Sequence, residues 1–375
     1  MLFRSQSCPL PHTTTNTLRP SPQFLMVNVQ THIIRFCAGG LLALAGAGLA
    51  QAQLLPNLGG QRVGISAFTF LKNDISPRSL AMGGANVTTA GDAYSAANNP
   101  AALSEVRQYA AGASVLSYAA GTFAHSNFSV LIPVKEAGTF FVNGNMLSMG
   151  SEKVRTEFQP LGTGETFANY SLSTGLGYSQ RLSQMFSIGI EIKYLQERLA
   201  QYRTGAIAAD IGFLYRTDWR NLRFGVVLQH FGANSTLKGN YSPNLLQNGQ
   251  EVPTEGYPAP ALFKMGALLD VVNVANHLLT AQLQLNHPND NAENIRLGLE
   301  YLVSEMFYIR GGVKLNIANE RAPVGGLGFK TTFGGSTIKI DYGISPSRFL
   351  GLYHNVGLAF YLRKSADPEP AQPAN

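Results

Sequence analysis

Apolar side chains recur at every second position through most of the chain after residue 107. Residues 170–179 place Tyr, Leu and Thr on one parity and Ser and Gly on the other, and residues 186–194 alternate Phe, Ile and Tyr with Ser, Gly, Glu and Lys. Because successive side chains of a strand point to opposite faces, each segment predicts a strand with one apolar and one small or polar face. Repeated over many segments, this pattern is typical of a transmembrane β-barrel, whose outer face meets lipid.

The alternating segments predict an all-β fold, an antiparallel transmembrane β-barrel of about fourteen strands. An even strand number suits a bacterial single-chain barrel. The predicted strands lie near residues 108–119, 123–133, 138–149, 167–180, 185–198, 203–216, 221–231, 260–271, 277–287, 293–303, 306–317, 323–332, 336–345 and 353–362. We expect the first and last strands to pair, because lipid offers no hydrogen bonds to an open sheet edge.

The connections between these strands differ in length in a regular way. Connections after even-numbered strands are short, and the two longest, residues 150–166 and 232–259, follow odd-numbered strands. Outer-membrane barrels have short periplasmic turns and longer outer loops, so this asymmetry predicts a periplasmic N-terminus. A soluble β-domain is the alternative, but such a domain does not require loop lengths to alternate.

Composition favours the same class. The chain has 375 residues, of which 13% are charged and 45% hydrophobic. This charge content is low for a soluble protein, yet the chain is too polar for a helical membrane protein. The net charge of +6 is dispersed without a Lys/Arg run, so nucleic acid is not an expected partner. No stretch after residue 52 holds eighteen successive apolar residues, which argues against a transmembrane helix.

The sequence predicts that neither end of the chain belongs to the barrel. Residues 1–52 form a predicted targeting segment, with a start at Met26 as a further expectation and a small-x-small cleavage site at residues 50–52. Both cysteines, Cys8 and Cys37, lie in this segment, so the processed chain would carry no disulfide, Cys-ligated zinc or Cys nucleophile. Residues 363–375, which contain Pro and Glu, are predicted to be a disordered tail.

Residues 53–107 alternate poorly and contain few large apolar side chains, in contrast to the barrel segment at residues 108–362. We interpret residues 53–107 as an N-terminal hatch, a plug around which the barrel closes. The alternative is an ordinary loop or short helix packed on a soluble β-domain. The motif residues that we single out in the hatch are Arg78, Met82, Gly83, Gly84, Asp92, Asn98, Asn99 and Pro100.

The hatch sequence carries a resemblance to a known family. Residues 74–85 (DISPRSLAMGGA), 91–95 (GDAYS) and 98–103 (NNPAAL) resemble the hatch region of the PorV/PorQ family. These are outer-membrane proteins of the type IX secretion system, within the FadL-like barrel superfamily. The GD-A and NPA-L parts recur across that superfamily, whereas the RS-LAMGG part points toward PorV/PorQ. Residues 257–260 and 263–267 are similar to the proline-led start of a mid-barrel strand in the same group.

The resemblance implies a location in the outer membrane and a non-catalytic role in protein secretion. A PorV-like member would bind cargo and shuttle it to the cell-surface attachment machinery. The implied partners are outer-membrane lipid, the translocon, the sortase or attachment complex, and the C-terminal domains of cargo proteins. The alternative is a FadL-like transporter that moves long-chain fatty acids or other hydrophobic compounds across the outer membrane.

Charged residues within the predicted strands fall on the parity opposite to the apolar side chains, so we expect them to face the lumen. They are Glu191, Lys193, Asp210, Arg223, Arg296, Glu300, Arg310, Lys314, Lys339 and Asp341. A charge on the lipid face near mid-membrane would cost about 2–4 kcal/mol. Their mixed signs indicate ion pairs that hold barrel and hatch together, with a substrate path as the alternative.

The remaining motifs give little support to catalysis. The histidines are scattered without an HExxH pattern, and no G-x-S-x-G elbow is present, so we expect no catalytic residue, metal site or cofactor. The loop 232–259 is the candidate partner-binding surface, because apolar side chains on an exposed loop either pack on themselves or dock a partner. The candidate residues in this loop are Tyr241, Leu245, Leu246, Val252 and Tyr257.

Overall fold

The computed structural model describes residues 64–118, 121–134, 138–200, 202–236, 238, 256–317, 320 and 323–362. The predicted targeting segment, the C-terminal tail and four of the five partner-loop residues (Tyr241, Leu245, Leu246 and Val252) lie outside these residues. Among the described residues, no helix is long and apolar enough to cross a membrane.

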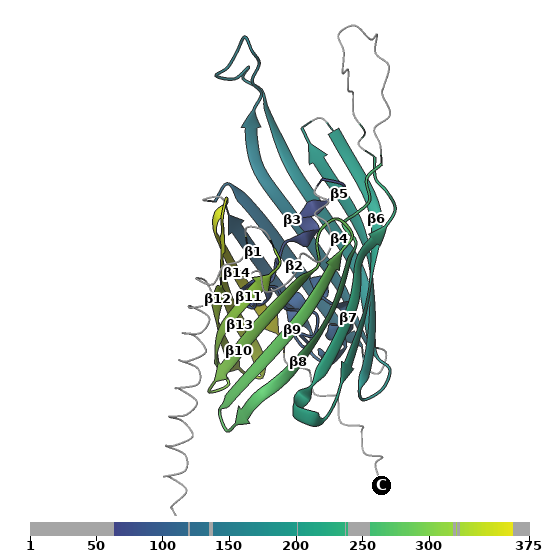
Figure 1. Cartoon of the computed structure of the whole chain (residues 1–375), viewed down its shortest axis with the longest axis vertical. Coiled ribbons are helices and arrows are strands. Elements are labelled where there is room, and N and C mark those ends of the chain that lie inside the picture. The colour runs from purple at the N-terminus through teal and green to yellow at the C-terminus, as the bar shows by residue number, and fades with distance from the viewer. Residues whose placement is uncertain are drawn as a thin grey trace, which may run out of the picture. The chain divides into compact units, whose positions relative to one another are not determined.

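Fourteen antiparallel strands close into a barrel in which every strand pairs with its neighbours in sequence and β1 pairs with β14. The predicted fold class is therefore confirmed (Figure 1). The strands are β1 (Ala110–Tyr118), β2 (Phe123–Val134), β3 (Gly138–Lys153), β4 (Thr166–Arg181), β5 (Phe186–Leu199), β6 (Tyr202–Arg216), β7 (Arg223–Gly232), β8 (Leu262–Val274), β9 (His277–Pro288), β10 (Asn294–Val303), β11 (Phe307–Leu315), β12 (Val324–Phe333), β13 (Ser336–Ser347) and β14 (Gly351–Tyr361).

Closure leaves no free sheet edge between the first and last strands. The β1–β14 register runs from Ala110 opposite Tyr361 to Ser117 opposite His354. Registers shift at three places, in the β3–β4, β6–β7 and β8–β9 pairs. Elsewhere one parity of each strand stays on the same face over its whole length, which is what the alternating sequence requires.

The outer face of the barrel is apolar. Large hydrophobic side chains on the outward parity are exposed, among them Phe128, Leu176, Ile192, Leu327 and Val356. A soluble monomer rarely exposes so continuous an apolar surface. This wall has the composition expected of strands that face lipid.

The hatch segment, defined here as residues 64–107, contains four short helices. They are η1 (Thr69–Lys72), α2 (Pro77–Ala81), η2 (Ala93–Ala97) and η3 (Pro100–Glu105); a further short helix, η4 (Trp219–Asn221), lies in the turn between β6 and β7. In Figure 1 the hatch segment is the purple to blue chain enclosed by the strands.

The sequence explains where the hatch helices begin. Ser76, Asp92 and Asn99 each precede a helix, and each side chain accepts a hydrogen bond from a backbone N–H of its first turn. Proline follows Ser76 and Asn99 at the first helical position, where its missing N–H costs nothing. Ser76, Asp92 and Asn99, which are residue types common in loops, therefore serve as N-caps of the hatch helices.

Ten lumen-facing glycines bring the wall into contact with backbone or side-chain atoms of the hatch segment. A Cβ built at any of them would lie 3.0 Å or less from a hatch atom, a distance at which something must shift. We call them the glycine belt: Gly112, Gly189, Gly212, Gly225, Gly266, Gly298, Gly312, Gly326, Gly343 and Gly357. Each lies on a different strand, so the hatch is seated against ten of the fourteen strands at van der Waals distance.

Candidate functional site

Arg78, at the start of α2, is the main electrostatic link between hatch and wall. Its Nε and Nη2 donate to the two carboxylate oxygens of Glu300 on β10 at 2.8 and 2.6 Å. Its Nη1 donates to Asp92 Oδ2 at 3.3 Å. A two-pronged guanidinium–carboxylate pair is both strong and geometrically specific, so it fixes the position of α2 against β10.

Three further wall charges extend this link into a network. Arg310 donates to Glu300 and to Asp341, each at 2.6 Å, and Lys339 lies 3.1 Å from Asp92 and 3.4 Å from Asp341. We call the six residues (Arg78, Asp92, Glu300, Arg310, Lys339 and Asp341) the hatch network. All six are buried or nearly so, and three cations face three carboxylates.

The hatch members of this network titrate far from their ordinary ranges. Burial alone would raise the pKa of Asp92, but Lys339 and Arg78 hold it well below its usual value. Burial alone would lower the pKa of Arg78, but Glu300 and Asp92 raise it. Both groups are therefore charged across the physiological range, and the network acts as a fixed clamp.

A second group of charges surrounds Asp74 at the loop before α2. Asp74 lies 3.0 Å from Arg296 Nη1 on β10 and 3.3 Å from Lys314 Nζ on β11, and Lys314 also pairs with Glu320 at 2.7 Å. Burial tends to raise the pKa of Asp74, but Arg296 and Lys314 keep it well below its usual value. Lys72 of η1 pairs with Asp290 at 2.8 Å.

A third group joins β5, β6 and β7. Lys193 lies between Asp210 at 2.6 Å and Glu191 at 3.5 Å, and all three are fully buried. Gln229 contacts Asp210 at 3.4 Å and also donates to the backbone oxygens of Ala97 and Asn98 in the hatch segment. This group therefore also reaches the hatch.

The structure places the other predicted site residues at the same hatch–wall boundary. Met82 contacts the belt glycines Gly298 and Gly312, and Gly83 packs on the Val313 backbone. Asn99 donates to the backbone oxygens of Val87 and Phe213.

The remaining predicted residues lie around this boundary. Arg296 Nη1 donates to the backbone oxygen of Gly84. Pro100 contacts Gly189 and Gly212. Arg223 lies 3.5 Å from Glu105 at the end of η3. Tyr257 of the partner loop exchanges backbone hydrogen bonds with Ser235.

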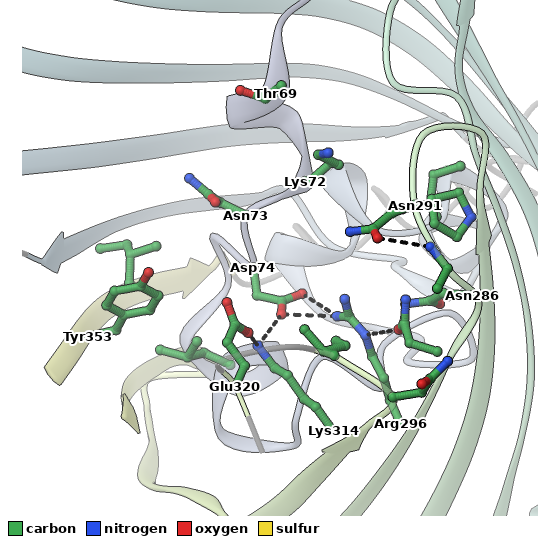
Figure 2. A pocket seen from close by; sticks show the side chains of 18 residues that line it. Thr69, Lys72, Asn73, Asp74, Asn286, Asn291, Arg296, Lys314, Glu320 and Tyr353 are labelled. Atoms are coloured by element: carbon green, nitrogen blue, oxygen red, sulfur yellow. Dashed lines mark hydrogen bonds and ion pairs between the residues drawn. The ribbon is translucent and has the colours of Figure 1, made fainter. Parts of the chain in front are cut away.

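A cavity of about 400 Å³ lies between the first part of the hatch segment and the ends of β9 and β11 (Figure 2). Its lining is mostly polar: charged groups from the hatch and from β10 and β11 alternate with amides from β9, β10 and their connection. The polar lining residues are Thr69, Lys72, Asn73, Asp74, Asn286, Asn291, Asn294, Arg296, Lys314, Asn316, Glu320 and Tyr353.

A smaller cavity of about 210 Å³ adjoins the first and shares Thr69, Asn73, Leu116 and Tyr353 with it. Its other lining residues are mostly apolar or aromatic: Phe70, Tyr118, Leu147, Met149 and Leu350, with Glu197 as the one charge among those that line it. Together the two spaces form what we call the two-part cavity: residues with polar side chains predominate around the larger part, and residues with apolar or aromatic side chains around the smaller part.

Sequence reasoning missed most of this cavity. The predicted lumen charges include Arg296 and Lys314, but not Lys72, Asp74 or the asparagines. No local signal marks those asparagines, because Asn73 lies in a hatch connection and the others stand near strand ends, where polar residues are ordinary. Only the register of β9, β10 and β11 gathers them.

No protein-family model matches the chain, and no curated protein matches it. Solved structures similar to it include monoaromatic hydrocarbon channels, a FadL homologue and porins. The toluene transporter TodX of Pseudomonas putida is 12% identical, with 75% of this chain and 96% of that chain covered at a TM-score of 0.48.

Two further structures give similar values. The CymD monoaromatic hydrocarbon channel is 12% identical over 80% of this chain and 100% of its own, with a TM-score of 0.49. A Pseudomonas aeruginosa FadL homologue is 11% identical over 80% of this chain and 98% of its own, with a TM-score of 0.48.

Proposed function

We propose that this protein is an outer-membrane channel that admits hydrophobic or amphipathic small molecules from outside the cell. The two-part cavity is the observation that carries the proposal. Its larger part, at about 400 Å³, falls within the usual range of ligand pockets, roughly 300–1,000 Å³. The wall around it has the apolar exterior that a bilayer requires.

The lining supports a ligand of mixed polarity. The amides and charges around Asn294 and Lys314 can hydrogen-bond a polar head, and Phe70, Leu147 and Met149 can pack against an apolar body. The hatch segment closes the axis below this site, through the hatch network and the glycine belt. A bound molecule can therefore pass toward the periplasm only after contacts between the hatch and the wall have opened.

Uptake in a deletion strain tests the proposal. Loss of the gene is expected to reduce uptake of oleate or of monoaromatic hydrocarbons while secreted cargo stays normal. In the complemented strain, Asn291→Trp should fill part of the cavity and lower uptake. Asn276→Trp, in the exposed turn between β8 and β9, is the matched control and should leave uptake unchanged. Normal uptake of every compound in the deletion strain would end the proposal.

A role in type IX secretion is our second candidate. The hatch sequence at residues 74–103 supports it, and so does the density of contacts between hatch and wall, because a protein that binds and shuttles cargo needs no path through its lumen. The partners would be the translocon, the attachment complex and cargo C-terminal domains. Loss of surface cargo with normal uptake in the deletion strain is the outcome that would favour this candidate.

A further inference from the structure

Lys264 on β8 is a lysine in an unusual setting. It points into the lumen, with only 6% of its surface exposed. Within the part of the chain that the structure describes, it makes no hydrogen bond and no ion pair. Burying an ammonium without a partner is costly, so a charged Lys264 needs a counter-charge or a strong acceptor nearby.

The neighbouring cations differ from Lys264, because each lies within ion-pair distance of a carboxylate. Lys193 is 2.6 Å from Asp210, Arg296 is 3.0 Å from Asp74, and Lys72 is 2.8 Å from Asp290. Among the described cations of this group, Lys264 therefore stands apart in having no carboxylate at such a distance.

Lys264 lines a small enclosed cavity of about 20 Å³, enough for one water-sized occupant. Asn98 and Asn145 line the same cavity, whose other charged lining residues are three cations (Lys72, Lys193 and Arg296) and one carboxylate (Asp74). The side-chain oxygen of Asn98 accepts from Asn86, and that of Asn145 accepts from Asn127. In the described bonds, the amide nitrogens of both residues remain as donors. An ammonium and two amide N–H₂ groups form a set that suits an anion.

We propose that this cavity is a binding site for a monatomic anion such as chloride, held by Lys264 Nζ and the amides of Asn98 and Asn145. The ion would lie between the hatch, which supplies Asn98 and the loop 71–75, and the wall strands β3 and β8. It would thereby tie the hatch to the wall at a point that the hatch network does not reach. The site is too small for sulfate.

Bromide is the probe, with the processed protein in detergent. Crystals soaked in sodium bromide are expected to show an anomalous peak beside Lys264 Nζ. Thermal unfolding midpoints should be higher in sodium chloride or bromide than in sodium sulfate or gluconate of equal ionic strength. Lys264→Met should remove this difference between salts, and Lys330→Met, a half-exposed lysine at the other end of the barrel, should keep it.

A second variant keeps the test decisive if Lys264→Met fails to fold. Asn145→Asp retains the acceptor that Asn127 uses and places a permanent carboxylate beside Lys264. It should fold, lose the halide dependence and show no bromide peak. A wild-type protein without a bromide peak, or a halide dependence that survives Asn145→Asp, would overturn the proposal and assign the cavity to water.

Discussion

Replacing Arg78 by methionine should loosen the hatch while the barrel stays folded. The change removes three charge-assisted hydrogen bonds, two to Glu300 and one to Asp92. Removing one partner of a buried pair costs about 3–5 kcal/mol when the other charge is left alone. Here Arg310 still holds Glu300 and Lys339 still holds Asp92, so we expect a smaller cost of about 2–4 kcal/mol for seating the hatch.

The assay measures how often the hatch opens. Ser95 in η2 is fully buried, and Ser95→Cys places a single thiol there in a processed chain that is predicted to have none. When opening is fast relative to reaction, the maleimide labelling rate follows the population of the open form. A cost of about 2–4 kcal/mol corresponds to labelling that is about 30 to 900 times faster, since about 1.36 kcal/mol is tenfold.

Arg155→Met in the exposed connection between β3 and β4 is the matched control and should leave the labelling rate unchanged. Heat-modifiable migration on a gel should show that both variants keep a folded barrel. If Arg78→Met labels no faster than Arg155→Met, then the hatch network does not hold the hatch, and the glycine belt and the ion pairs of Lys72 and Asp74 must.

Three other perturbations follow from the same contacts. Gly312→Val should destabilise the protein by about 1–3 kcal/mol through overpacking against Met82, whereas Gly311→Val on the open outer face should not, as denaturant unfolding can show. Leu176→Arg on the lipid face should cost about 2–4 kcal/mol in bilayer refolding, and an exposed-loop control, Leu161→Arg, close to zero. Because Asp74 and Asp92 have lowered pKa values in the folded state, the stability they contribute is complete above the unfolded value of about 3.9 and is lost as pH falls below it. Thermal unfolding midpoints should therefore hold from pH 7 to about 5 and fall below about 4.

The strands could be predicted from sequence because their signal is local. Each strand must switch between lipid and lumen at every second residue, so a window of ten residues carries its own evidence. The observed strand ends differ from the predicted ones by a few residues at most; β14, for example, begins at Gly351 rather than near residue 353. Turn residues, not the alternating pattern, set these ends.

The pairing of charges could not be predicted in the same way. Arg78 and Glu300 are 222 residues apart, and their contact depends on how the hatch is seated and on the registers that bring β10 beside β11. The parity rule shows that Glu300 faces inward, but not which cation it meets. The two-part cavity depends on the same long-range geometry. Its asparagines could therefore not be predicted as cavity residues from the sequence.

The glycine belt has a consequence for how the molecule is assembled. Ten strands, β1, β5 to β8 and β10 to β14, lie so close to hatch atoms that little room is left for threading the hatch into a finished cylinder. The hatch precedes the strands in the chain, so it can act as a template around which the strands pair before β1 meets β14. Assembly of this protein is thus expected to follow an order, in which the hatch segment is in place before the barrel closes.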